Sequence, residues 1–172
     1  PISAPRATST CLHAAPLSAT CSYSQLSIST GTGITLHDIT DDIKAAITSA
    51  GVKDGSVTIF SRHTTTAVTI NEMESRLVDD LKTWLLELAP PEKPYLHNDL
   101  HLRSGPKDWP GGDEAWRAQE PINAHSHLLS MMLGNSESIP VVDGKLMMGT
   151  WQSVILVELD GPRDRGVGIQ VC

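Results

Sequence analysis

Polar and apolar residues alternate with a period of two in three stretches of the first half of the chain. This alternation is typical of strands with one buried face. The stretches are residues 23–30, residues 57–62 and the segment around Val68 and Ile70. Gly31 and Gly33 turn the chain after the first stretch, and Asp54-Gly55 is a turn that leads into the second.

Apolar residues repeat every three or four positions in three other stretches, which predicts helices. Asp38 is expected to cap the first helix, and Gly51 is a suitable residue to end it. The clearest helical pattern covers residues 77–88 and stops before Pro90. A shorter helix is predicted over residues 124–133.

The C-terminal third has the pattern of a β-meander. Residues 139–142 and 145–148 flank Asp143-Gly144, a strong two-residue hairpin signal, and two further β-rich runs follow. Residues 90–121 lack periodicity and predict a long loop, which is often functional in a compact domain. Together these elements predict an α+β domain with a mainly antiparallel sheet.

Composition narrows the classes of partner. A length of 172 residues favours one domain, and 40% hydrophobic with 19% charged residues fits an ordinary soluble globule. The formal net charge of −7 argues against nucleic acid as a partner, because polyanion binding usually needs a basic surface. No apolar run is long enough to cross a bilayer, so no membrane contact is expected.

Residues 1–22 are expected to form an irregular N-terminal arm, followed by a domain over residues 23–172. The arm is rich in Pro, Ser, Thr and Ala and lacks acidic residues. We favour an arm packed on the body or on a neighbouring subunit of a cytoplasmic protein, with an organellar transit peptide as the alternative. Because the chain starts at Pro1, we expect further residues upstream. Deleting residues 1–20 is expected to leave the fold intact.

Cys11, Cys21 and Cys172 show no CxxC spacing. We expect three free thiols in a reducing compartment, with a disulfide between Cys11 and Cys21 as the alternative. None of the three has an acid or base beside it in sequence, so none is a convincing nucleophile.

Four histidines are the main candidates for chemistry: His63, His97, His125 and His127. Neutral imidazole is the commonest metal ligand, but the diffuse spacing makes a weak metal motif. If residues 124–133 are fully helical, His125 and His127 point about 200° apart and do not share one ion. Each single histidine is more simply a hydrogen-bonded structural or surface residue, whereas three or four together favour a site.

Several polar residues have simpler structural explanations beside a functional one. Asn71 stands three residues before Glu74, as in a capping box, so Asn71 is either a helix cap or a ligand contact. Glu72 lies at the start of a helix, where negative charge is favourable. Lys145 and Arg163, with Arg165, lie in or beside hairpin turns, where charges are usually solvated.

Nine short motifs in a fixed order resemble the YjbQ family, whose members carry the name secondary thiamine-phosphate synthase. The resemblance covers roughly residues 23–171 and is highly specific when the motifs are taken together. In order, the motifs are His63-Thr64-Thr65, Ile70-Asn71-Glu72, Tyr95-Leu96-His97, Ala124-His125-Ser126-His127, Gly134-Asn135-Ser136, Ile139-Pro140-Val141, Asp143-Gly144-Lys145-Leu146, Gly149-Thr150-Trp151-Gln152 and Asp160-Gly161-Pro162-Arg163.

The resemblance implies a single compact α+β domain with a large mixed, mainly antiparallel sheet and flanking helices, assembled as a homotrimer. It also implies a pocket with a bound divalent metal ion, for which zinc is expected. His63, His97 and His127 are the expected ligands, and His125 is expected outside the first shell if a helix includes it. Glu72, Asp99 or a backbone carbonyl is expected to accept a hydrogen bond from the other ring N–H of a ligand.

The activity attached to the family joins a pyrimidine diphosphate to a thiazole phosphate with loss of diphosphate, so a small phosphorylated substrate is expected. His63, Glu72 and His127 are the expected catalytic residues. The expected substrate-binding residues are Thr64, Thr65, Asn71, Lys145, Trp151, Gln152 and Arg163. A metal-dependent hydrolase and a non-catalytic trimeric protein that binds a metabolite or metal are the alternatives.

Overall fold

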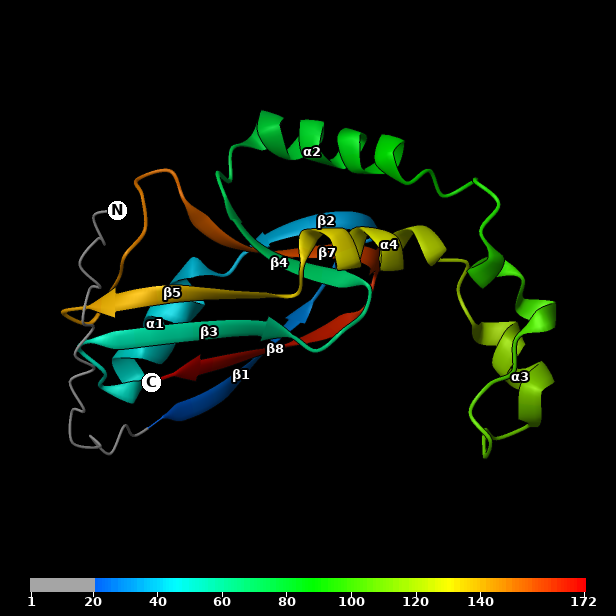
Figure 1. Ribbon diagram of the computed structural model, residues 1–172, viewed down its shortest axis with the longest axis horizontal. Coiled ribbons are helices and arrows are strands. Elements are labelled where there is room, and N and C mark those ends of the chain that lie inside the picture. Colours follow the sequence, from blue (N-terminus) through cyan, green and yellow to red (C-terminus); the bar gives the residue numbers. More distant parts are fainter. Residues whose placement is uncertain (1–20) are drawn as a thin grey trace, which may run out of the picture.

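The structure of the chain is a computed structural model, and it describes residues 21–172 (Figure 1). The expected arm over residues 1–22 and the tolerance to its deletion therefore lie almost wholly outside the described residues. The described helices are α1 (Thr40–Ala50), α2 (Ser75–Leu88), α3 (Gly112–Gln119) and α4 (Ala124–Leu133). The strands are β1 (Ser22–Ser29), β2 (Gly33–Asp38), β3 (Gly55–Ser61), β4 (Thr66–Asn71), β5 (Ser136–Val142), β6 (Lys145–Leu146), β7 (Ser153–Gly161) and β8 (Asp164–Val171).

The described strands form two antiparallel sheets. One has five strands in the order β1-β8-β3-β5-β6, and the other has three in the order β2-β7-β4. The α+β class and the antiparallel pairing are thus confirmed, with the strands divided between two sheets. None of the helices among residues 21–172 has the length and apolarity that a membrane span needs.

β7 is buried on both faces, which explains its unbroken apolar sequence. Val154 and Leu156 belong to a core that α1 shares with both sheets. Ile155 and Val157 belong to a second core on the opposite face, beneath α2 and α4. The three-stranded sheet is therefore a central layer, with the five-stranded sheet and α1 on one side (Figure 1).

One of the two helix starts agrees with the expected cap and the other does not. The Asp38 carboxylate accepts hydrogen bonds from the backbone N–H and hydroxyl of Thr40, so it does hold the start of α1. At α2 the cap is Glu74, whose carboxylate accepts the backbone N–H groups of Arg76 and Leu77. The Asn71 side chain instead accepts the backbone N–H of Glu72, three residues too early to serve the helix.

The expected structureless loop over residues 90–121 is wrong. It contains two 3₁₀ turns, η1 (Leu96–Asn98) and η2 (Leu100–Leu102), followed by α3. The Arg103 guanidinium stacks 5.0 Å from the ring centre of the buried Trp116 and pairs with Glu120 at 3.1 Å. This small local core stabilises α3, which lies apart from the two sheets in Figure 1.

The expectation of free thiols is wrong for two of the three cysteines. Cys21 and Cys172 form a disulfide across 151 positions of sequence. The reason is the register of two neighbouring strands, because β1 pairs with β8 so that Ser22 lies opposite Val171. Cys11, the partner proposed as an alternative, lies outside the described residues.

We predict that Cys21→Ser lowers the free energy of unfolding by about 2–4 kcal/mol, because the crosslink restricts the unfolded chain. Thermal melts with and without reductant are the measurement. Reductant is expected to lower the melting temperature of the wild type and leave that of C21S unchanged. Equal melting temperatures for both proteins, or a non-reduced peptide map without a Cys21–Cys172 link, would contradict the assignment.

Candidate functional site

A short connection between two strands carries the first functional histidine. β3 ends at Ser61 and β4 begins at Thr66, so His63 and Thr64 lie in a tight turn between neighbouring sheets. The Ser61 and Thr66 hydroxyls are hydrogen-bonded to each other in the interior and hold the two ends of this connection together. The sequence folds this way because both hydroxyls are buried and each needs a partner.

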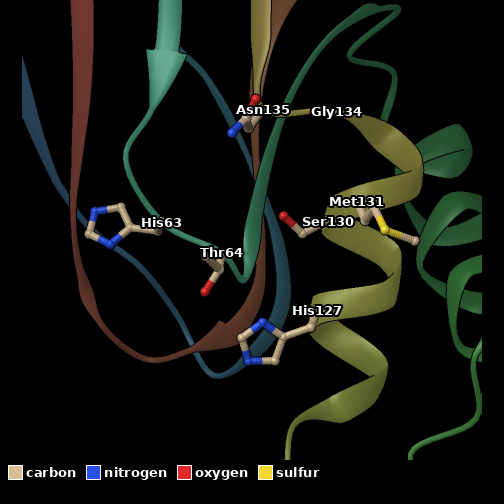
Figure 2. A pocket seen from close by; sticks show the side chains of 7 residues that line it. All are labelled: His63, Thr64, His127, Ser130, Met131, Gly134 and Asn135. Atoms are coloured by element: carbon tan, nitrogen blue, oxygen red, sulfur yellow. The ribbon is translucent and has the colours of Figure 1, made fainter. Parts of the chain in front are cut away.

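The connection faces α4 across a cavity of about 370 Å³ (Figure 2). We call this cavity the histidine pocket. This volume suits a small metabolite rather than a macromolecular segment. Its lining consists of imidazoles, hydroxyls, an amide and one thioether: His63, Thr64, His127, Ser130, Met131, Gly134 and Asn135.

His63 is fixed on one side by the backbone of β8. Its Nε2 accepts a hydrogen bond of 2.8 Å from the backbone N–H of Gly166. Burial lowers the pKa of His63, and the positive charge of Arg165 lowers it further. His63 is therefore neutral at pH 7, and Nε2 is the ring nitrogen that bears the lone pair.

His127 and His97 form a close pair. Their rings meet edge to face with centres 4.8 Å apart. Burial lowers the pKa of both histidines; for His97 the nearby Arg103 charge lowers the pKa further, while for His127 the negative charge of Asp160 partly offsets the effect. His97 Nε2 is buried and has no hydrogen-bond partner among the described residues.

His125 does not join this group. α4 includes both His125 and His127, so the helix turns their side chains apart. The histidine pocket is lined by His127 and not by His125. The ring of His125 instead lies 3.2 Å from the Ser126 hydroxyl, and burial lowers its pKa.

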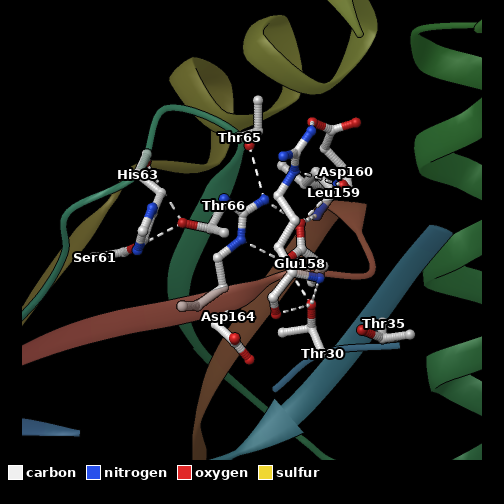
Figure 3. A network of polar contacts seen from close by, with 12 residues as sticks. Thr30, Thr35, Ser61, His63, Thr65, Thr66, Glu158, Leu159, Asp160 and Asp164 are labelled. Carbon is white, nitrogen blue, oxygen red and sulfur yellow. Dashed lines mark hydrogen bonds and ion pairs between the residues drawn. The ribbon is translucent and has the colours of Figure 1, made fainter. Parts of the chain in front are cut away.

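Beneath the pocket lies a buried ion pair that the sequence analysis missed (Figure 3). Glu158 is fully buried and Arg165 is 6% exposed, and two N–H groups of the guanidinium donate to the two carboxylate oxygens at 2.6 Å each. Although burial raises the pKa of Glu158, hydrogen bonds from Arg165 and others outweigh that effect and hold the pKa below its usual value. The available signal was a glutamate inside an apolar strand, which requires a buried partner.

The same ion pair ties three segments together. Arg165 also donates to the Thr65 hydroxyl at 2.9 Å, and the Thr30 hydroxyl donates to Glu158 at 2.9 Å. Thr65, expected as a substrate contact, is buried and does not line the histidine pocket. Its hydroxyl accepts the hydrogen bond from Arg165 instead. Arg165 was expected to be solvated in a turn, but it lies in β8 in the interior.

The remaining expected site residues lie elsewhere. Glu72, Trp151 and Gln152 line a second cavity of about 400 Å³, and within one chain they do not share the histidine pocket. The reason is that β4 separates His63 from Glu72, and six residues of strand span roughly 20 Å.

Three further expected contacts also lie apart from the histidine pocket. Asn71 lines a small cavity under α2, and Lys145 lies in the edge strand β6. Arg163 pairs with Asp160 at 3.0 Å in the β7–β8 turn. None of the three lines the cavity that contains His63 and His127.

Of the three expected metal ligands, His97 and His127 could share an ion and His63 could not join them through Nε2. Within residues 21–172, no three His, Cys, Asp or Glu side chains are grouped closely enough to hold an ion. His97 and His127 do fit, because they are adjacent and His97 Nε2 lacks a partner. In its present ring orientation His63 does not fit through Nε2, since that lone pair accepts the Gly166 N–H.

Comparison with known proteins identifies one family. The family model described as UPF0047 protein YjbQ-like matches residues 24–172. A UPF0047 protein of Methanothermobacter thermautotrophicus is 35% identical over 86% of this chain and 89% of its own length. One from Archaeoglobus fulgidus is 36% identical over 83% of this chain and 95% of its own length.

Solved structures agree with the sequence relatives. A YbjQ-like protein of unknown function from Sulfolobus solfataricus P2 has a TM-score of 0.74 and 33% identity, covering 88% of this chain and 96% of that one. A hypothetical protein from Aeropyrum pernix K1 has a TM-score of 0.74 and 31% identity, covering 88% and 98%. The names of these relatives state no activity.

We predict that the free energy of unfolding falls as the pH is lowered from 7 to 5. The pKa values of His63, His97, His125 and His127 are lowered in the folded protein, whereas unfolded histidines take up protons near pH 6.5. Between these values the unfolded chain binds more protons, so stability rises with pH. Urea melts across this range are the measurement. His127→Gln is expected to show a shallower slope, and equal slopes for both proteins would contradict the prediction.

Proposed function

The chain belongs to the UPF0047 protein YjbQ-like family, and on that premise we propose that its histidine pocket binds a small phosphorylated substrate. We further propose that the pocket promotes loss of a phosphate or diphosphate leaving group. The reaction is a group transfer of the thiamine-phosphate synthase type that the sequence resemblance implies.

One observation supports the proposal above the others: neutral imidazoles and hydroxyls converge on a cavity of about 370 Å³. His63 and His127 supply ring nitrogens, and Thr64 and Ser130 supply hydroxyls. Such groups bind phosphate oxygens by hydrogen bonds without a large fixed charge, so the leaving group is not held too tightly to depart. A partly enclosed site also strengthens these hydrogen bonds relative to water.

The residues have separate roles in this proposal. Thr64 and Ser130 orient the phosphate group, and His127 handles a proton at the reacting centre because its lowered pKa keeps it neutral. As an alternative to this proton role of His127, His97 and His127 are the residues that would hold a divalent ion, for which zinc suits imidazole ligands. When bound, such an ion would neutralise the charge that develops on the leaving group.

A metal-dependent hydrolase is the second candidate, and one observation favours it. The transfer reaction develops a carbocation, which an aromatic face would stabilise. Apart from its two imidazoles, the described lining of the histidine pocket contains no aromatic ring, and Trp151 lies in the second cavity. Hydrolysis does not require that stabilisation.

We predict that His127→Asn lowers kcat/KM for diphosphate release at least a hundredfold, which is typical for loss of an acid or base. The measurement is diphosphate release from the pyrimidine diphosphate, with and without the thiazole phosphate. Lys44→Ala on the exposed face of α1 is the matched control and is expected to retain full activity.

The pattern of release separates the candidates. Release that depends on the thiazole phosphate supports the transferase, and release in its absence supports the hydrolase. Tight binding of both compounds without any release would contradict an enzyme and favour a metabolite-binding protein. Unchanged activity of H127N would contradict the assignment of the histidine pocket as the active site.

We also propose that the protein is a homotrimer, as the family resemblance implies. Large apolar side chains lie exposed on the single chain, with Leu96 at 89%, Met131 at 79% and Trp151 at 74%. Assembly would remove such side chains from water. Met131 lies beside the histidine pocket, so a neighbouring copy that covers it would also cover the pocket's rim.

Light scattering on the protein at micromolar concentration is expected to give three times the chain mass of 18.5 kDa. Met131→Lys is expected to shift the mass towards that of one chain, because burial of an unpaired charge opposes association. Surface variant K44A serves as the control and should remain trimeric. A wild-type mass of 18.5 kDa would contradict the proposal.

A further inference from the structure

The orientation of the His63 ring has a chemical consequence. A backbone N–H can only donate a hydrogen bond, so the 2.8 Å contact from Gly166 requires a lone pair on Nε2 of His63. A neutral imidazole carries one proton, which must then be on Nδ1. The single nitrogen left for a ligand in the pocket is therefore a donor.

Gly166 is held in place by its neighbour in sequence. Arg165 is clamped by two hydrogen bonds to the buried Glu158, and Glu158 also accepts the backbone N–H groups of Leu159 and Asp160. These contacts fix the end of β7 against the start of β8, the strand that carries Gly166; Figure 3 shows Glu158, Leu159 and Asp160 in this network. The N–H that faces His63 therefore has little freedom to turn away.

The same guanidinium holds the segment that carries His63. Arg165 donates to the hydroxyl of Thr65, two residues beyond His63. The backbone carbonyl of Gly166 accepts the N–H of Arg62, one residue before His63. The donor and the acceptor of the Gly166–His63 bond are thus both positioned by one buried ion pair.

We infer that Glu158 and Arg165 are positioning residues for His63: through Gly166 they fix its Nδ1–H tautomer, so that His63 donates a hydrogen bond to an anionic oxygen of the ligand. This assignment differs from the expected three-histidine metal site, because Nε2 of His63 does not ligate an ion in this arrangement. A metal would then be held by His97 and His127 without His63. The donor role rests on the proposed phosphorylated substrate, whereas the tautomer does not.

An arginine at position 165 suits this positioning role better than a lysine would. The planar guanidinium makes two parallel hydrogen bonds to the Glu158 carboxylate and still reaches Thr65 with one of the same nitrogens. A lysine has no such fork, so Arg165→Lys would keep the charge and lose the geometry. The buried pair is costly to break on one side but not when both partners become apolar together.

The test is the ¹⁵N NMR spectrum of the imidazole nitrogens in the full chain, with His63 assigned by comparison with His63→Asn. In the wild type we expect a protonated Nδ1 and an unprotonated Nε2. The double variant Glu158→Leu/Arg165→Met is expected to fold and to show a mixture of both tautomers. Arg165→Lys is expected to show the same mixture with the buried charge retained. Lys44→Met, which removes an exposed ion pair with Asp41, should leave the wild-type signals unchanged.

Titration with inorganic diphosphate and with zinc completes the test. We expect His63→Asn and the double variant to weaken diphosphate binding about tenfold, as for loss of one hydrogen bond to a charged group, and to leave zinc binding unchanged. A protonated Nε2 in the wild type, or an unchanged tautomer in the folded double variant, would overturn the inference. A wild type with the expected tautomer that binds no diphosphate would overturn the donor role and the proposed function, but not the positioning of His63.

Discussion

The buried ion pair between Glu158 and Arg165 is the interaction on which the architecture of the site depends. Its two charges lie in the interior, where neither is stable without the other and without further hydrogen bonds. Those additional bonds go to Thr30, to Thr65 and to backbone N–H groups at the end of β7. The pair therefore joins the chain before β2, the connection between β3 and β4, and the β7–β8 turn at one point.

This junction explains why the histidines and hydroxyls of the pocket lie at one end of the central sheet. The strand end that carries the ion pair also carries the connection with His63 and faces the helix with His127. The opposite end of β4 holds Glu72, near Trp151 and Gln152, around a separate and more acidic cavity. The geometry of one chain thus divides the polar motifs into two groups, one around His63 and His127 and the other around Glu72.

Much of the fold follows from local patterns, but the site depends on long-range register. The helices of residues 40–50 and 75–88 and most strands match their periodicity, because each buries one regular face. The sequence also indicates His63 and His127, because several histidines together favour a site. It does not indicate the disulfide of Cys21 with Cys172 or the ion pair of Glu158, since both depend on which strands become neighbours. Glu72 lies near His63 in sequence but not in space, because the extended strand β4 separates the two residues.

Mapping of inorganic diphosphate by backbone amide NMR reports where on the chain a phosphorylated group binds, and so tests the histidine pocket as the phosphate site. We expect shifts that saturate together at Thr64, Ser130 and Asn135, with the amides of Thr150 and Gln152 unaffected. Saturable shifts confined to Thr150 and Gln152, or the absence of shifts at millimolar diphosphate, would contradict a phosphate site in the histidine pocket.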